Sequence, residues 1–497
     1  MSFNRRDILV GLGTSSFFPS IASSQIPHAS LTSDVLVLIP GILGSVLARD
    51  GKEVWAPSAK ALGRAIVSLG SSVTNLALNP GEDGTHANDG VKATRLLEDV
   101  HLLPGLWKID GYSRLQKEML SLPGIRRGEN FFAFPYDWRL DNRIAAKELA
   151  EAAPKWLSSW RKKSGNNTAR LIFLTHSMGG LIARYYLECL GGWEQTRFLV
   201  SFGTPYRGSL NALNKLVNGM KIRAGATDLA DLSGFVRSLT SIYQLLPTYP
   251  CLSKSNSDQL LRVNEYALPR IDPQRLANAT QFHHEIEQAV AANLKTSKYT
   301  EEGYTIVPIV GTSQFTLQSG KERSDGTIEF SDNHSGQAID GDGTVPRPSA
   351  TPPELSGKNR ELYVPQQHAS LQNTTAVIQQ ITGMVKEQQI AWDQFRAGPR
   401  SLSLQVPTLV SSQDPIDVSG SYHGVAGKPE GHMVVEDLSG QMPLRTYAIE
   451  PKHGTYKHTL LGIPDGSYRI TVTIVDGGGV DRQSVSDVLI SMDAATH

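Results

Sequence analysis

The sequence of 497 residues predicts a large α/β domain with a mostly parallel sheet flanked by helices, followed by a small all-β domain. Two patterns lead to this fold class. From about residue 34 to residue 384, short continuous apolar runs alternate with segments of helical apolar spacing, as in parallel sheets covered on both faces. After about residue 397 the runs alternate apolar with polar residues, which is typical of half-buried antiparallel strands.

Six continuous apolar runs are the expected strands of the parallel sheet. Residues that are buried on both faces of a sheet need no alternation with polar residues. The runs are 35–39, 131–134, 171–174, 198–202, 306–310 and 362–364. Between them, 112–120 and 145–160 carry apolar residues three and four positions apart, which predicts helices that pack on the sheet.

Two long stretches interrupt the alternation, at about 50–107 and 206–297. Both far exceed the usual connection of about four to six residues, so we expect cap or lid insertions above the sheet. The second contains an apolar cluster at 242–247, which we expect to lie on the inner surface of such a lid and to become exposed when the lid opens. The alternative is a packed helical insertion that only stabilises the fold. The α/β domain is expected to span 31–397.

Residues 399–497 are expected to form a small β-sandwich. Alternating runs such as 468–475 are separated by Pro-Asp-Gly and Gly-Gly-Gly turns, as in antiparallel sandwiches. A surface or glycan ligand is one role considered for this domain. Because the sandwich has alternating strands of its own, we expect a chain that ends near residue 398 to fold and to keep its activity.

The first 22 residues resemble a twin-arginine export signal. Arg5 and Arg6 precede a modest apolar run, and Ser20-Ile21-Ala22 offers the small residues of a cleavage site. The alternative is an uncleaved anchor or a frayed terminus. We expect an exported protein, periplasmic or extracellular. No other apolar run approaches 18 residues, so we expect the mature chain to have no integral membrane span.

The charge balance and the cysteine content exclude two classes of protein, those that bind nucleic acid and those held together by many disulfides. Lys plus Arg equal Asp plus Glu at 48 each, so no long-range field attracts nucleic acid and we expect no such partner. Any lipid substrate would have to be recognised by apolar contact. Only Cys189 and Cys251 are present, which excludes a disulfide framework and leaves a single bridge open.

The strongest chemical signal is the stretch Thr175 to Gly180, "THSMGG", between an apolar strand and a helix. A serine in such a sharp strand-to-helix turn presents its hydroxyl above the sheet edge as a nucleophile. That residue is Ser177. The backbone N–H of Met178, at the start of the helix, is a candidate oxyanion donor. Thr175 stands where the usual motif has glycine. The alternative is an ordinary turn without chemistry.

A nucleophilic serine needs a histidine base and an acid that orients it, and in this fold they follow in the order Ser, acid, His. Asp342 is favoured over Asp340 because it directly precedes a Gly-Thr-Val turn. The alternative, a calcium loop, lacks the later ligands of an EF-hand. His368 follows the acid by 26 positions, on a loop after a strand. His334 precedes the acid, and His176 adjoins the serine, so both are disfavoured.

The second oxyanion donor is expected from the loop after the first strand. Its sequence is "PGILGS" at 40–45, and its glycines let the backbone approach the nucleophile. The N–H of Ile42 is then expected to pair with that of Met178. This chemistry requires neither a metal nor a cofactor, and we expect none.

Five of these segments together are similar to the lecithin:cholesterol acyltransferase family of α/β-hydrolases, over about residues 34–385. They are "PGILGS", "FPYDWRLD" at 134–141, "THSMGG", "DGDGTVP" and "QHASL", with further likeness in "FGTPYRGS" at 202–209 and "LLPT" at 245–248. The twin-arginine leader suggests a bacterial-type exported member. The resemblance implies an α/β-hydrolase fold, a catalytic triad, an oxyanion hole and a mobile lid after Pro205; the implied triad is Ser177, Asp342 and His368, and the implied donors are Ile42 and Met178.

Three functional hypotheses follow. The first is an esterase, lipase or phospholipase that hydrolyses lipid acyl esters through an acyl-enzyme. The second is a lipid O-acyltransferase, which passes the same acyl group to an alcohol. The third is a surface-binding protein with a vestigial triad, which the presence of all three residues in order disfavours. Head group and chain length do not follow from the sequence.

Overall fold

The computed structural model describes residues 34–56, 75–78, 89–98, 101–103, 107–224, 227–358, 360–387, 401–425, 427–479 and 482–492. The export signal predicted at 1–22 lies outside the described residues, as do several stretches of the first excursion. Within the described part of the chain, no helix is long and apolar enough to cross a membrane.

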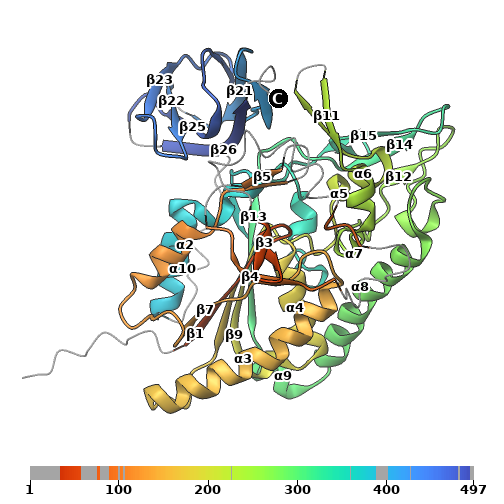
Figure 1. The fold of residues 1–497 in the computed structure, drawn as a ribbon, viewed down its shortest axis with the longest axis vertical. Helices are drawn as coiled ribbons and strands as arrows, with labels where there is room; N and C mark the ends of the chain where they lie inside the picture. The colour runs from red at the N-terminus through yellow and green to blue at the C-terminus, as the bar shows by residue number, and fades with distance from the viewer. Residues whose placement is uncertain are drawn as a thin grey trace, which may run out of the picture.

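A six-stranded sheet stands at the centre of the α/β domain (Figure 1). Every neighbouring pair of strands is parallel, and the fold class predicted from the continuous apolar runs is confirmed. In spatial order the strands are β18 (Leu362–Val364), β13 (Thr305–Gly311), β9 (Thr196–Phe202), β8 (Leu171–His176), β1 (Val35–Ile39) and β7 (Phe131–Ala133). All residues of β1 and β8 are buried, because helices cover both faces of the sheet.

Helices flank the sheet on opposite sides in Figure 1. On one side α2 (Ser113–Leu120) packs against α10 (Thr375–Glu387), and on the other α3 (Asn142–Ser164), α4 (Gly179–Cys189) and α8 (Pro273–Asn293) pack in sequence. The helices expected at 112–120 and 145–160 are therefore confirmed. Helix α3 begins where the Asp141 carboxylate accepts the N–H of Arg143, and it ends at Gly165 in the left-handed conformation.

The first excursion contains two antiparallel units. Strand β2 (Ser45–Arg49) pairs with β3 (Lys52–Trp55) and β4 (Val91–Leu96), while β5 (His101–Leu103) pairs with β6 (Trp107–Ile109). Arg139 joins this excursion to the domain, since its guanidinium donates to Asp89 at 2.6 Å and to Asp137 at 2.6 Å. Burial by itself would lower the pKa of this arginine, but the two carboxylates outweigh it and raise the pKa above its ordinary value, so Arg139 is charged.

The second excursion is mostly helical and packed. It holds α5 (Leu210–Asn218), the hairpin β10–β11 (Lys221–Ala224 and Thr227–Asp231), α6 (Ser233–Ser238), α7 (Thr240–Tyr243), β12 (Leu252–Ser253), η2 (Val263–Glu265) and α8. The apolar cluster expected at 242–247 belongs to the main core: Ile242 is 0% exposed, and Leu245 and Leu246 are at most 4% exposed. In this conformation the cluster is therefore core rather than a lid surface.

Shorter elements complete the α/β domain. They are η1 (Gly192–Gln195), α9 (Ser297–Glu302), β14 (Ser319–Glu322), β15 (Ile328–Ser331), β16 (Asn333–His334), β17 (Gln337–Ala338), η3 (Arg347–Ala350), η4 (Pro353–Leu355) and η5 (His368–Asn373). Both cysteines are free thiols: Cys251 is buried and Cys189 half-buried. The single bridge left open by the sequence is thus not formed.

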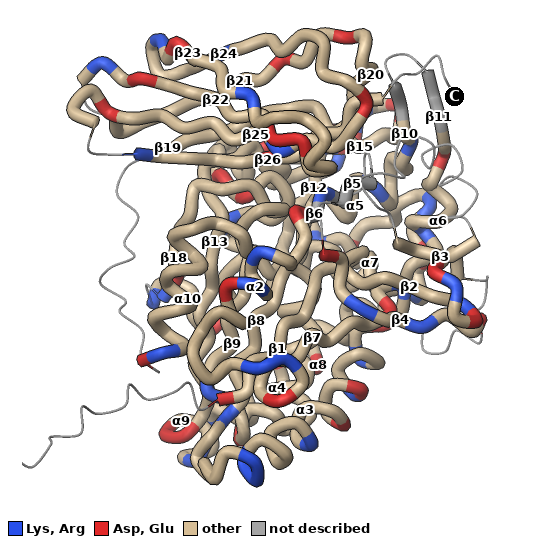
Figure 2. The backbone as a smooth tube through the Cα atoms, turned by 60° about the vertical axis from the view of Figure 1, so that its left-hand side comes forward, with Lys and Arg blue, Asp and Glu red and all other residues tan. Residues whose placement is uncertain are grey.

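The C-terminal region is all β, and its strands form two sheets (Figure 2). One has the order β20-β26-β25-β22-β23 and the other β19-β21-β24. The strands are β19 (Ser401–Leu402), β20 (Leu409–Ser411), β21 (Ile416–His423), β22 (Glu430–Asp437), β23 (Arg445–Ile449), β24 (Thr455–Leu460), β25 (Gly466–Val475) and β26 (Arg482–Met492). Apolar side chains between the sheets form a core of their own.

This region is not packed independently of the α/β domain. Val488, Ile490 and Met492 of β26 belong to the main core of the protein. Arg469 pairs with the buried carboxylate of Asp110. The shared core argues against the expectation that the α/β domain is stable without residues 399–497, because removal of β26 exposes apolar surface on the remainder.

Candidate active site

Ser177 lies in the sharp turn between β8 and α4. Its φ of +53° is in the left-handed region, and such strain in a non-glycine residue is typical of functional turns. The turn needs small neighbours: a Cβ at Gly179 would lie 2.4 Å from the Pro40 carbonyl oxygen, and one at Gly180 would lie 2.0 Å from Thr204 Oγ1. The two glycines after the serine therefore allow the loop at 40–45 and the segment after β9 to close on the turn.

Thr175, the departure from the usual glycine, is fully buried at the end of β8. Its hydroxyl donates to the Val200 carbonyl on neighbouring β9 at 3.1 Å. A buried hydroxyl with a hydrogen-bond partner carries little penalty. The side chain is thus accommodated within the sheet, and the turn keeps its shape.

Asp342 lies in a loop between β13 and β18 and is fully buried. Its Oδ1 accepts the backbone N–H groups of Thr344 at 2.9 Å and Val345 at 2.7 Å. Its Oδ2 lies 2.7 Å from Nδ1 of His368. The "DGTV" turn therefore occupies one carboxylate oxygen and leaves the other for the histidine.

His368 begins η5, just beyond β18, and is 4% exposed. Its Nε2 lies 2.9 Å from Ser177 Oγ. The structure therefore brings Ser177, His368 and Asp342 into one hydrogen-bonded chain, all at the carboxyl ends of parallel strands. Gly203 makes room for it, because a Cβ there would lie 2.7 Å from Asp342 Oδ2 and 2.9 Å from His368 Nδ1.

The rival residues lie elsewhere. Asp340 Oδ2 accepts the Ser313 N–H at 2.7 Å and does not contact His368. His334 Nε2 lies 2.9 Å from the Pro250 carbonyl in the second excursion. The structure thus places both residues away from the serine.

The loop at 40–45 lies directly against the serine turn. A Cβ at Gly41 would be 2.9 Å from Ser177 Cβ, so the loop and the turn are in contact at this point. The backbone N–H groups of Ile42 and Met178 make no hydrogen bond to any described residue. Unpaired N–H groups in two segments that contact the Ser177 turn are candidates for an oxyanion hole.

The segment "YDWR" at 136–139 forms hydrogen bonds with this loop. The Tyr136 hydroxyl donates to the Pro40 carbonyl at 3.0 Å, and Trp138 Nε1 donates to the Ser45 carbonyl at 3.1 Å. Both side chains are at most 1% exposed. The sequence singled out this segment only by resemblance. The structure gives it a physical role, because both ends of the loop at 40–45 are fixed to it.

Sequence reasoning missed the contacts between the C-terminal sandwich and the histidine loop. Gln367 Nε2 donates to Gln314 Oε1 at 3.0 Å and to the Leu404 carbonyl at 2.6 Å. Next to it, Gln366 Oε1 accepts the Ser486 N–H at 2.9 Å. The only signal was the pair of glutamines before His368, which has no partner visible in the sequence.

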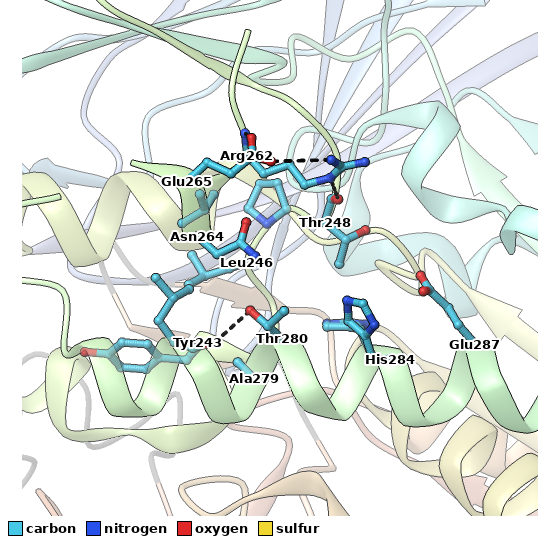
Figure 3. Close-up of a pocket in the computed structure, with 14 residues that line it drawn as sticks. Tyr243, Leu246, Thr248, Arg262, Asn264, Glu265, Ala279, Thr280, His284 and Glu287 are labelled. Atoms are coloured by element: carbon cyan, nitrogen blue, oxygen red, sulfur yellow. Dashed lines mark hydrogen bonds and ion pairs between the residues drawn. The ribbon is translucent and has the colours of Figure 1, made fainter. Parts of the chain in front are cut away.

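A cavity of about 390 Å³ lies in the second excursion, between α8 and the segment 243–265 (Figure 3). Arg262 crosses one wall, where it donates to the Thr248 carbonyl at 3.1 Å and pairs with Glu265. The described residues that line this cavity include none of Ser177, Asp342 and His368. It is therefore distinct from the serine site. Among the described residues, no cluster of His, Cys, Asp or Glu is placed to hold a metal ion.

Comparisons with known proteins agree with this geometry. The sequence profile described as "Lecithin:cholesterol acyltransferase" matches residues 73–324, just over half of the chain. The match includes Ser177 and ends before Asp342 and His368, so the hydrogen-bond geometry is the support for these two.

Two Arabidopsis thaliana proteins are among the relatives. "Lecithin-cholesterol acyltransferase-like 4" is 26% identical over 255 residues, which are 46% of this chain and 44% of the relative. "Phospholipase A(1) LCAT3" is 29% identical over 138 residues, 27% of this chain and 29% of the relative. The matched part thus spans less than half the length of each relative.

Solved structures with the same overall extent superpose poorly. The lipase BlEst2 of Bacillus licheniformis is 11% identical, with a TM-score of 0.28 and coverage of 93% of this chain and 94% of that one. Phospholipase PlaB of Legionella pneumophila is 8% identical, with a TM-score of 0.21 and 92% coverage of both. The α/β-hydrolase fold is therefore identified from the strand order, the serine turn and the sequence profile.

Proposed function

The chain belongs to the lecithin:cholesterol acyltransferase family, and we propose on this basis that it cleaves lipid acyl esters through an acyl-enzyme on Ser177. The observation that carries the proposal is the hydrogen-bonded chain from Ser177 Oγ through His368 to Asp342 Oδ2, with distances of 2.9 and 2.7 Å. A carboxylate can only accept, so His368 carries its proton on Nδ1 and offers Nε2 to the serine. This is the tautomer that a general base needs.

The proposed cycle has two halves. Ser177 Oγ attacks the ester carbonyl while its proton passes to His368 Nε2, and the N–H groups of Ile42 and Met178 bind the oxyanion. The tetrahedral intermediate collapses, the alcohol departs with the proton from His368, and the acyl group stays on Ser177. A second hydroxyl, from water or an alcohol, then attacks the acyl-enzyme as His368 removes its proton. The second tetrahedral intermediate collapses, the bond from the acyl carbon to Ser177 Oγ breaks, and His368 returns the proton to Ser177. Asp342 stabilises the imidazolium in both halves.

Burial of the site supports an apolar substrate. Ser177 is 5% exposed and His368 is 4% exposed, so bulk water has little access to the reacting atoms. Lys plus Arg equal Asp plus Glu at 48 each, and both signs of charge are interspersed along the part of the backbone that the structure describes (Figure 2). This balance supports a substrate that is bound mainly through its apolar chains.

Hydrolysis and acyl transfer share the acyl-enzyme and differ only in the second nucleophile. The names of the two Arabidopsis relatives include one of each kind, an acyltransferase-like protein and a phospholipase A(1). We therefore keep transfer to an alcohol as the second candidate activity. A purely surface-binding protein is disfavoured, because binding does not need a buried serine aligned with a histidine and an aspartate.

Product analysis tests the proposal. The protein is incubated with vesicles of mixed phospholipids and neutral lipids, with and without a sterol or long-chain alcohol. Free fatty acid in both samples indicates hydrolysis, and a new ester that needs the alcohol indicates transfer. Ser177→Ala is expected to abolish both products. Ser201→Ala, which alters a buried serine on β9, is the matched control and should keep activity within about twofold. Lipids left intact by the wild type would contradict the proposal.

A further inference from the structure

A buried chain of hydrogen bonds runs behind the serine, and the proposed chemistry does not use it. The Gly41 N–H lies 2.9 Å from the Tyr112 hydroxyl, which lies 2.9 Å from His176 Nδ1. His176 Nε2 lies 3.1 Å from the His368 carbonyl oxygen. Tyr112 is 0% exposed and His176 is 2% exposed. The chain therefore connects the residue before Ile42 with the backbone of His368.

The partners determine where each proton lies. A carbonyl oxygen only accepts, so His176 must carry its proton on Nε2 to bond with the His368 carbonyl. A neutral imidazole then has a bare Nδ1, which accepts the Tyr112 hydroxyl proton. The Tyr112 oxygen in turn accepts the Gly41 N–H, because a backbone amide only donates. All hydrogen bonds thus run in one direction, from the oxyanion loop to the base.

The neutral form of His176 is strongly favoured. Burial, with a smaller contribution from the adjacent His368 ring, lowers the pKa of His176 to about 3. Burial also raises the pKa of Tyr112 well above its ordinary value, so it keeps its hydroxyl proton. The chain therefore keeps its direction when His368 gains and loses a proton during a catalytic cycle.

We infer that Tyr112 and His176 are positioning residues that hold the oxyanion loop and the catalytic base at a fixed separation. The inference rests on the proposed function of Ser177 and His368. His176 directly precedes Ser177 in the turn. One end of the hydrogen-bonded chain is Gly41, next to the proposed oxyanion donor Ile42, and the other end is the backbone of the base, His368. A shift of any segment lengthens one of the hydrogen bonds. Misplacement by about 1 Å can lower the rate about a hundredfold, so hydrogen bonds that fix these segments are expected to raise kcat.

A merely structural role predicts something different. If the chain only satisfies buried polar groups, its loss lowers the free energy of unfolding and leaves kcat close to that of the wild type. A positioning role predicts a lower kcat with KM nearly unchanged, because the loop and base act on the transition state. The affinity for a trifluoromethyl ketone, which forms a tetrahedral adduct, must then fall by the same factor as kcat/KM.

Three substitutions interrupt the chain at different points. Tyr112→Phe removes the hydroxyl and keeps the ring. His176→Asn places an oxygen near the Nδ1 position and removes the donor to His368, whereas His176→Gln places a donor near the Nε2 position and removes the acceptor for Tyr112. The matched control is Tyr304→Phe, which removes another hydroxyl with two partners, Glu188 and Arg184, at the opposite end of the sheet.

We expect Tyr112→Phe to lower kcat at least about tenfold, with KM within about twofold and a matching loss of ketone affinity. Each His176 variant should show the same changes in kcat, KM and ketone affinity. In the double variant, Tyr112→Phe with His176→Gln, kcat should fall no further than in the more damaged single variant, because the two residues act as a unit. Tyr304→Phe should keep kcat within about twofold. Wild-type kcat in the Tyr112→Phe and His176 variants, even with lowered stability, would overturn the inference.

One readout is independent of turnover. Side-chain ¹H–¹⁵N spectra of histidine-labelled protein report the tautomer of His176, assigned by its loss in His176→Gln. We expect the Nε2–H form, still neutral at about pH 5. An Nδ1–H or protonated His176 would overturn the inference whatever the substrate. The proposed function fails separately, if Ser177 does not react with a fluorophosphonate in the wild type.

Discussion

Asp342→Asn is the substitution whose consequence the structure defines most closely. The two N–H donors at Asp342 Oδ1, from Thr344 and Val345, require an oxygen there, so the asparagine amide must place its NH₂ at the Oδ2 position. That NH₂ donates to His368 Nδ1 and moves the histidine proton to Nε2. The opposite rotamer sets NH₂ against two N–H groups, at about 1–3 kcal/mol for each unpaired donor.

A histidine with its proton on Nε2 cannot accept the proton of Ser177. The expected loss in kcat is about 10⁴-fold, which corresponds to about 5 kcal/mol in the activation free energy. The matched control is Asp340→Asn. Asparagine keeps the acceptor for the Ser313 N–H, and the ion pair of Asp340 with the half-exposed Arg347, at 3.5 Å, is worth only about 0–1 kcal/mol. We expect kcat within about threefold of the wild type.

The assay is steady-state turnover of a short soluble p-nitrophenyl ester, with thermal melts to show that both variants are folded. Equal losses in the two variants would refute the assignment of Asp342 as the acid. A folded Asp342→Asn protein that kept more than about a tenth of wild-type kcat would refute the tautomer reasoning.

Three further predictions address the surroundings of the site. Gly203→Ala should lower kcat about a hundredfold by displacing the acid and the base, whereas Gly191→Ala, also at positive φ but with open space around it, should only lower the melting temperature. Burial lowers the pKa of His176 to about 3 and that of His283 to about 4, so below about pH 6.5 the unfolded chain binds protons that the folded protein does not. The free energy of unfolding, measured by urea denaturation, should therefore fall by about 1.4 kcal/mol per pH unit for each of these two histidines as the pH drops toward 4. A free energy of unfolding that did not change with pH would contradict this. Removal of residues 399–497 should leave a protein that aggregates, because the main core loses the side chains of β26. Size-exclusion chromatography detects the aggregates. A monodisperse, active product would show instead that the two regions fold separately.

Much of the fold was accessible from the sequence because its signals are local. The six apolar runs predicted all strands of the central sheet, since a strand buried on both faces must be continuously apolar. The three residues that the structure links by hydrogen bonds, Ser177, His368 and Asp342, were predicted from signals of the same local kind. The turn at Ser177, the glycines around Asp342 and the loop of His368 each have a short signature, and the fold fixes their order along the chain.

What the sequence did not reveal depends on contacts between distant residues. Tyr112 lies 64 positions from His176 and 71 from Gly41, and an isolated tyrosine at the start of a helix has no signature of a bracing role. The cluster at 242–247 was expected on a lid surface, yet an apolar run has the same composition in a core as in a lid. The roles of Gln366 and Gln367 likewise follow only from their hydrogen bonds to the C-terminal sandwich.

The most direct test of the proposed acyl-enzyme is to identify the acylated residue. The protein is mixed with an activated short-chain ester, quenched in acid within the first turnovers, digested and analysed by mass spectrometry. We predict one acyl group on the peptide that contains Ser177, which disappears as substrate is exhausted and is absent from Ser177→Ala. An acyl group on another residue, or wild-type turnover by Ser177→Ala, would contradict the proposal.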